Sequence, residues 1–207
     1  MSSTEHTSAT HVYRDDVGSR MGMWLFLFTE LILFGGMFLL YSVYRFQYAD
    51  AFHLAAKELN TIMGAFNTVV LLTSSLTMAL SIVAIQRNQK TLSMLLQMIT
   101  IFLALFFLVN KYFEWTAKFH HGIYPGSEEL LSKDSGEILF FGLYYVMTGL
   151  HGIHVIVGLV LIAVMTRMTR KDIITKDNYV RLENAGLYWH LVDIIWIFLF
   201  PLFYLIT

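Results

Sequence analysis

Five long apolar stretches, separated by short polar segments, dominate the hydropathy pattern of this chain. The first four predict helices over residues 21–44, 62–86, 91–110 and 138–166, and a fifth helix begins at Glu183. Each predicted helix has about 20 residues or more, which at ~1.5 Å per residue crosses the ~30 Å hydrocarbon core of a bilayer. The pattern therefore predicts an all-α integral membrane bundle of five transmembrane helices.

Composition and length support one membrane domain. Of the 207 residues, 57% are hydrophobic and 14% are charged, against about a quarter charged in soluble domains. We expect a polar N-terminal tail at residues 1–20 and a single five-helix domain at residues 21–207. The tail lacks the basic start and apolar core of a cleavable signal peptide, and no function is assigned to its His6 and His11.

Charge and cysteine content exclude several classes of function. The net charge of −1 argues against a nucleic-acid partner, and the absence of cysteine excludes disulfides, iron–sulfur clusters and thiolate zinc sites.

The tail, the 87–90 turn and the 167–181 loop share one side of the predicted bundle. They hold nine basic residues: Arg14, Arg20, Arg87, Lys90, Arg167, Arg170, Lys171, Lys176 and Arg181. The other side holds five, so the N-terminus is predicted in the cytoplasm and the C-terminus in the periplasm.

Glu30 is the only formal charge in the first predicted helix. About ten residues from the start of that helix, it lies ~15 Å deep, near the bilayer midplane. Apolar surroundings favour its neutral form, hydrogen-bonded to a neighbouring helix. An isolated intramembrane carboxyl is a functional candidate by default. The nearby Gly35 and Gly36 allow another helix to approach closely.

The last apolar stretch contains two polar side chains, His190 and Asp193, and two tryptophans, Trp189 and Trp196. His190 and Asp193 are three residues apart, which places them on one helix face within reach of a hydrogen bond. Such polar groups most often join helices inside a membrane bundle. A proton site or a ligand site at these residues is the alternative.

The fourth stretch carries His151 and His154 on one face, with glycines on either side of them. Interhelical hydrogen bonding is favoured over metal ligation. Two alternatives stay open. One is ligation of a b-type haem by two histidines on facing helices, and the other is a proton path through Glu30, the histidines and Asp193. The alternative function is therefore an independent membrane haem- or quinone-binding protein.

Further candidates lie near the ends of the predicted helices. Lys111 and Glu114 are three residues apart and are expected to pair at the membrane interface. Arg167 begins a basic loop, and Glu183 suits the N-terminal dipole of the last helix. The loop at residues 119–137 is acidic and most simply a solvated loop.

Two sequence motifs resemble subunit III of the haem-copper oxidases. These are Tyr188-Trp-His-Leu-Val-Asp-Ile-Ile-Trp196 and Thr148-Gly-Leu-His-Gly-Ile-His-Val-Ile-Val-Gly158. The order of other landmarks also fits, including Phe28-Thr-Glu30-Leu and Leu72-Thr-Ser-Ser-Leu-Thr77. The resemblance covers about residues 20–205 and is closest to the five-helix bacterial form, which lacks the first two helices of the seven-helix form.

The resemblance implies a non-catalytic subunit of a proton-pumping respiratory terminal oxidase in aerobic electron transport, with cytochrome c favoured over quinol as electron donor. It implies no cofactor and no active centre in this chain, with haems and copper in partner subunits. Expected partners are subunit I directly, subunit II, a small subunit IV, phospholipids in a cleft and a respiratory supercomplex. The expected location is the bacterial cytoplasmic membrane. The family's buried helix carboxyl would correspond to Glu30, and the His, Glu and Asp of its signatures would correspond to His151, His154, Glu183, His190 and Asp193. With Glu114, Arg167 and Trp189, these residues are the candidates for buried polar, structural or lipid-contacting roles.

Overall fold

The computed structural model describes residues 15–120 and 122–206. Five long helices cross the molecule: α1 (Asp16–Gln47), α3 (Thr61–Gln86), α4 (Lys90–His120), α6 (Ser135–Arg170) and α7 (Val180–Tyr204). Two short helices, α2 (Ala49–Ala56) and α5 (Glu128–Leu131), lie in the connections. All five long helices are long and apolar enough to span a membrane, which confirms the predicted all-α, multi-pass architecture.

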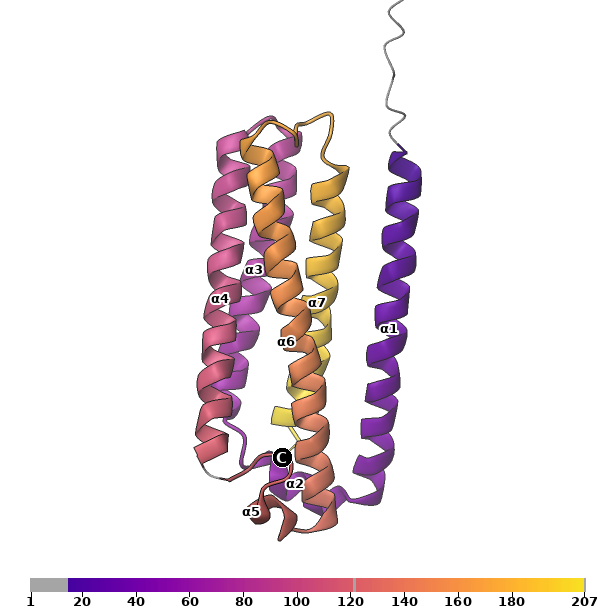
Figure 1. Cartoon of the computed structure of the whole chain (residues 1–207), viewed down its shortest axis with the longest axis vertical. Helices are drawn as coiled ribbons and strands as arrows, with labels where there is room; N and C mark the ends of the chain where they lie inside the picture. The colour runs from indigo at the N-terminus through magenta and orange to yellow at the C-terminus, as the bar shows by residue number, and fades with distance from the viewer. Residues whose placement is uncertain (1–14, 121, 207) are drawn as a thin grey trace, which may run out of the picture.

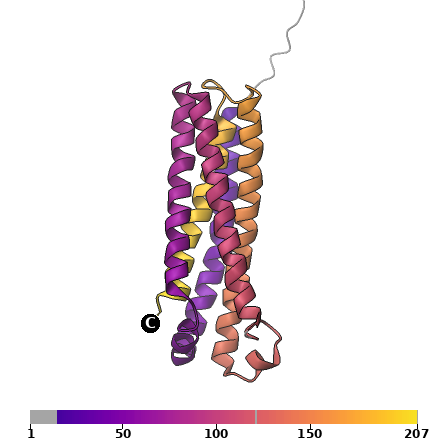
Figure 2. The same ribbon diagram turned by 90° about the vertical axis from the view of Figure 1, so that its left-hand side faces the viewer.

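The helices α3, α4, α6 and α7 form a bundle, and α1 lies to one side of it against α6 and α7 (Figures 1 and 2). The start of α1, the α3–α4 turn and the α6–α7 loop lie at one end of the molecule (Figure 1). The short helices α2 and α5 and the C-terminal end of α7 lie at the other end (Figure 1). The basic connections are therefore gathered at one end, and the acidic connection is at the opposite end.

Side-chain caps begin several of these helices. Asp15 accepts a hydrogen bond from the backbone N–H of Gly18 at 2.7 Å, at the start of α1. Asn60 does the same for Met63 at 3.1 Å, at the start of α3. Such caps satisfy N–H groups that have no partner inside the helix. Because of the Asp15 cap, α1 begins five residues before the predicted helix and includes residues 16–20, which the prediction placed in the tail. The tail histidines His6 and His11 lie outside the described residues.

The third predicted helix was expected to run from residue 91 to at least residue 110, and α4 continues to His120. Lys111, Glu114 and Lys118 are inside this helix, and Glu114 and Lys118 are buried. A charged residue normally marks the end of a hydrophobic span, but here charges of opposite sign are paired inside the bundle. The loop predicted at residues 119–137 contains α5 and the start of α6.

Aromatic side chains of α7 fill the centre of the bundle, and Trp189, Trp196 and Phe203 are almost completely buried. Glycines on neighbouring helices make room for this helix. A Cβ atom added at Gly158 would lie 2.7 Å from the Trp189 ring, and one at Gly64 would lie 2.8 Å from the Phe200 ring. Small residues at these contacts allow membrane helices to approach closely, so α7 is held on two sides.

The C-terminal end of α7 is held by side chains of other helices. The last carbonyl groups of a helix have no partner within it. Here the carbonyl oxygens of Leu202, Tyr204 and, just beyond the helix, Ile206 accept hydrogen bonds. The donors are the side chains of Tyr41, Thr61 and His53, respectively. These contacts connect α1, α2 and α3 to the end of α7.

Candidate functional site

A buried cluster of charged and phenolic side chains joins α4, α6 and α7. The Glu114 carboxylate, 7% exposed, accepts hydrogen bonds from the Tyr144 hydroxyl at 2.7 Å and from the Tyr204 hydroxyl. Lys111 donates to its other oxygen at 3.1 Å. The predicted Lys111–Glu114 pair therefore forms, and both side chains are largely buried inside the bundle.

The Lys111 ammonium is compensated on several sides. It donates to the Tyr204 hydroxyl at 2.7 Å and lies 4.8 Å from the centre of the Trp196 ring. An ammonium group near an aromatic face gains cation–π attraction, which is largest where water is excluded. A buried charge needs such partners to offset its desolvation. One ion pair and its hydrogen bonds therefore connect α4, α6 and α7.

Glu30 and His154 connect α1 to α6. The Nε2 atom of His154 lies 2.9 Å from a Glu30 carboxyl oxygen, and both side chains are largely buried, at 13% and 14% exposure. The Nδ1 atom of His154 lies 2.8 Å from the Leu150 carbonyl. A carbonyl only accepts, so Nδ1 carries a proton. The pair is then either a neutral acid donating to a neutral imidazole, or a carboxylate accepting from an imidazolium. Glu30 thus has the expected partner on a neighbouring helix, and one proton is held between them.

His151 does not make the interhelical hydrogen bond that was predicted for it. Its ring lies between Phe107, whose centroid is 5.7 Å away, and Trp196, at 5.2 Å. Among the described residues, neither ring nitrogen has a hydrogen-bond partner. His154 also lies near aromatic rings, but it has Glu30 of α1 within hydrogen-bond distance. A buried group without a partner costs about 1–3 kcal/mol.

His190 and Asp193 do not form a hydrogen bond with each other, so that prediction is wrong. The Nδ1 atom of His190 lies 2.7 Å from the Ser75 hydroxyl on α3. Asp193 is buried, and neither of its oxygens has a partner of normal hydrogen-bond geometry in the described chain, although Ser75 is its polar neighbour. The adjacent Trp189 donates to Ser74 at 3.1 Å. Ser74 and Ser75 of α3 face α7, so Trp189 and His190 form hydrogen bonds to another helix.

Other predicted residues lie nearer the basic end of the molecule. Glu183 pairs with Arg20 at 2.8 Å and so joins the start of α7 to the start of α1. Arg167 is exposed in the last turn of α6. Neither residue belongs to the Glu114 cluster.

Sequence reasoning missed Tyr144 and Tyr204, the hydrogen-bond donors to Glu114. Both lie in apolar helices, where a tyrosine pattern does not distinguish a membrane-interface residue from a buried one. A usable signal was the buried charge at Glu114, because a buried carboxylate requires donors.

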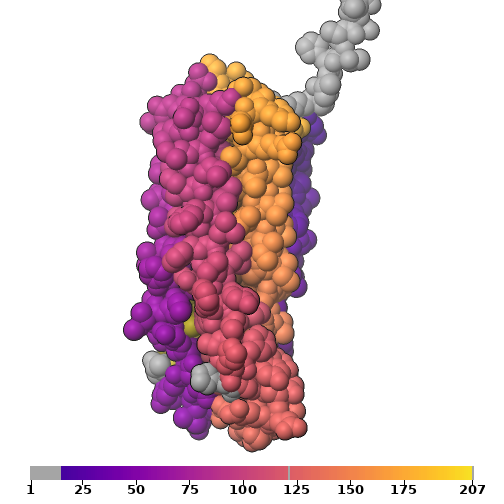
Figure 3. Space-filling model, turned by 60° about the vertical axis from the view of Figure 1, so that its left-hand side comes forward, coloured from indigo at the N-terminus to yellow at the C-terminus, as the bar shows by residue number. Residues whose placement is uncertain are grey.

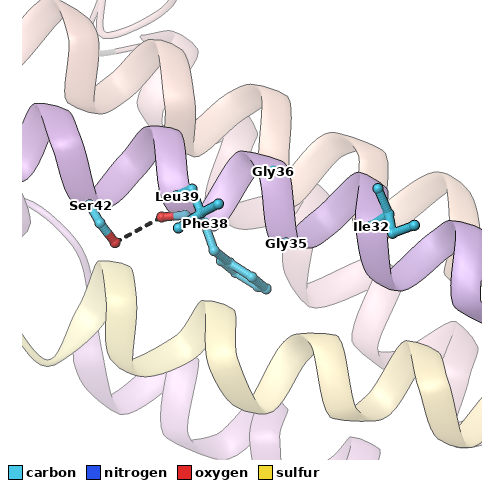
Figure 4. A pocket seen from close by; sticks show the side chains of 6 residues that line it. All are labelled: Ile32, Gly35, Gly36, Phe38, Leu39 and Ser42. Carbon is cyan, nitrogen blue, oxygen red and sulfur yellow. Dashed lines mark hydrogen bonds between the residues drawn. The ribbon is translucent and has the colours of Figure 1, made fainter.

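The outward face of α1 is open. A shallow pocket of about 590 Å³ lies along it, and a Cβ atom added at Gly35 or Gly36 would contact nothing within 4 Å (Figure 4). Ile32 and Leu39 lie on either side of the glycines, and the Ser42 hydroxyl bonds back to the Phe38 carbonyl at 2.8 Å. The close helix approach predicted at these glycines is therefore not made by the described part of this chain.

Comparison with known proteins identifies the family. The family model described as cytochrome c oxidase subunit III matches residues 1–207. Cytochrome c oxidase subunit 3 of Alkalihalophilus pseudofirmus is 37% identical over 188 residues, 89% of this chain and 85% of the relative. A probable quinol oxidase subunit 3 of Staphylococcus saprophyticus is 29% identical, covering 91% of this chain and 89% of the relative.

A longer relative matches a smaller part of its own length. The haem-copper oxidase subunit I+III of Aeropyrum pernix is 28% identical over 193 residues, which is 90% of this chain and 22% of that relative. The family match covers the whole chain, and the Alkalihalophilus pseudofirmus relative is 37% identical with 85% of its length covered. This chain belongs to the cytochrome c oxidase subunit III family.

Proposed function

We propose that this chain is the non-catalytic subunit III of a proton-pumping respiratory terminal oxidase and packs directly on subunit I. The observation that carries the proposal is the subunit I+III relative, which matches 90% of this chain. In that relative, both subunits belong to one polypeptide. The separate chain would then lie beside subunit I in the same way.

The internal geometry supports a structural role for the buried polar residues. Glu114, Lys111 and the two tyrosines satisfy one another, and Glu30 is paired with His154. These bonds connect α1, α4, α6 and α7, so they stabilise the arrangement of the helices. We propose that oxygen reduction takes place at haems and copper in partner subunits and that this chain supports their stability and proton uptake.

The open face of α1 is the proposed contact with another oxidase subunit. Small residues such as Gly35 and Gly36 are typical of helix–helix contacts in membranes, and no helix of the described chain covers them. Subunit II, a small subunit IV, bound phospholipid and a respiratory supercomplex are further proposed partners. We propose cytochrome c as the electron donor.

The proposed location is the bacterial cytoplasmic membrane. The end of the molecule with the start of α1 and the basic connections would face the cytoplasm by the positive-inside rule. The C-terminal end of α7 would then face the periplasm.

Turnover of a Glu30→Gln complex tests the non-catalytic assignment. The amide keeps the size of the side chain and a hydrogen-bonding group for His154, so oxygen reduction should persist, with altered proton pumping or faster inactivation at most. The measurement is oxygen consumption by the purified complex, with haem content as the control for assembly. Loss of oxygen reduction in a fully assembled complex would show that this carboxyl is catalytic and contradict the proposal.

A further inference from the structure

We propose that the groove between α4 and α6 binds one acyl chain of a membrane phospholipid, in the leaflet at the α2 and α5 end of the molecule. The groove has a volume of about 730 Å³. It lies between α4 and α6, which are side by side on the face shown in Figure 3. Its walls include Tyr112, Trp115 and Phe119 of α4 and Gly149, Gly152 and Ile153 of α6. We call it the α4–α6 groove.

Missing side chains on α6 create this groove. A Cβ atom added at Gly152 would meet nothing within 4 Å, and one at Gly149 would lie 3.2 Å from the Trp115 ring. The opposite wall is aromatic. Lys111 also lines the groove, but its ammonium group is bonded inward to Glu114 and Tyr204. Its methylene groups are therefore the part available to the groove, and the surface is suited to a hydrocarbon.

The depth of the groove matches one leaflet. The 31 residues of α4 at ~1.5 Å each span ~46 Å, so ~8 Å, or about five residues, extend beyond the ~30 Å core at each end. This places Trp115 at the edge of the hydrocarbon core and Phe107 near its middle. From Trp115 to Phe107 the groove covers ~12 Å of the ~15 Å hydrocarbon leaflet, and from Trp115 to Phe119 it extends ~6 Å beyond the edge of the hydrocarbon core.

The volume distinguishes a lipid chain from a protein helix. A helix segment ~18 Å long and ~10 Å wide occupies about 1,400 Å³, roughly twice the volume of the groove. A single unbranched chain is much narrower than a helix and follows a narrow apolar groove. At the outer end, the exposed Phe119 lies ~6 Å beyond Trp115, at the level where aromatic residues meet the polar part of the bilayer. The headgroup would lie there, beyond Trp115.

The α4–α6 groove is separate from the lipid cleft that the family resemblance implies. The resemblance implies that one wall of that cleft is built by the first two helices of the seven-helix form, which are absent from the five-helix form. The residues that line the α4–α6 groove come from α4 and α6. Binding there therefore needs no additional helix from a partner subunit.

A photoreactive phospholipid tests the inference in the purified complex. Phosphatidylcholine with a diazirine on one acyl chain is exchanged into the complex, loosely held lipid is washed away with detergent, and labelled peptides are mapped by mass spectrometry. We expect labelling of α4 and α6 peptides that line the groove to survive washing, while labelling of the exposed α3 residues Val69, Leu72 and Leu76 is lost. Native mass spectrometry should detect the retained lipid.

Two glycine variants on α6 provide the comparison. Gly152→Leu places a side chain in the groove, so wash-resistant labelling should fall to the level of the exposed α3 residues and one retained lipid should be lost. Gly142→Leu is the matched control, because a Cβ atom at Gly142 also meets nothing within 4 Å and Gly142 does not line the groove. Its labelling should equal that of the unmodified complex.

Three outcomes would overturn the inference. One is groove labelling in the unmodified complex that is no more resistant to washing than labelling of the exposed α3 residues. A second is a crosslink from the groove to a second copy or another oxidase subunit, which would show that a protein helix covers it. The third is unchanged lipid retention in Gly152→Leu. If Gly152→Leu fails to assemble, the test rests on the unmodified complex, in which groove labelling that resists washing supports the inference and groove labelling that is lost on washing contradicts it.

Discussion

Replacing Glu114 with Gln should strongly destabilise the chain, because the change removes the negative charge from a buried ion pair. The amide keeps the size of the side chain, and its oxygen can still accept from Tyr144 and Tyr204. The Lys111 ammonium, however, is left buried without an opposite charge. The substitution thus isolates the electrostatic part of the Glu114 cluster.

The size of the effect follows from the geometry. At the observed 3.1 Å between Lys111 Nζ and Glu114 Oε2 and an effective dielectric constant of about 20, Coulomb attraction is about 5 kcal/mol. Breaking a buried ion pair by removing one partner costs about 3–5 kcal/mol. We therefore expect Glu114→Gln to lower the free energy of unfolding by roughly 3–5 kcal/mol. Adding Lys111→Met should recover at least about 2 kcal/mol, because it removes the uncompensated charge.

The assay is the free energy of unfolding of the purified chain in bicelles, measured for the two single variants and the double variant. Asp172→Asn is the surface control. Asp172 pairs with Lys90 at 2.6 Å, but its side chain is 71% exposed, so its loss should cost less than about 1 kcal/mol. If the double variant loses as much stability as the two single variants added together, Lys111 and Glu114 are not coupled and the reasoning fails.

Two further predictions concern the contact between α6 and α7 and the pH response outside the membrane. Gly158→Ala should lower the free energy of unfolding by about 1–3 kcal/mol, because the added Cβ would lie 2.7 Å from the Trp189 ring. Gly142→Ala on the same helix should be nearly neutral, because its Cβ would meet open space. Equal losses of stability in the two variants would contradict this. For Lys133, burial lowers the pKa, but hydrogen bonds and charges, including those of Glu58, raise it above its usual range. The stabilisation is therefore fully present below the unfolded-state pKa, about 10.4, and is lost as pH rises through the higher folded-state pKa. Hydrogen exchange in α2 should accelerate in that alkaline range, and Lys133→Met should remove the extra pH dependence; an unchanged pH dependence would contradict the assignment.

The five membrane helices could be predicted from sequence because long apolar runs determine them directly. The end of α4 could not, since Lys111 and Glu114 resemble the polar edge of a span until their partners on α6 and α7 are known. Residue spacing placed His190 and Asp193 on one face, but it did not show that Ser75 on α3 would take the His190 hydrogen bond. The Glu30–His154 pair likewise depends on how α1 packs against α6. Contacts between residues far apart in the sequence were thus the part that spacing within one helix could not provide.

Isolation of the chain with its native partners tests the central claim most directly. An affinity tag on this chain, followed by extraction in a gentle detergent, should recover a multi-helix haem protein in a one-to-one ratio, with haem absorption in that partner. Recovery of this chain only as a free monomer or homo-oligomer, or a haem Soret band in the isolated chain itself, would contradict its assignment as a non-catalytic oxidase subunit.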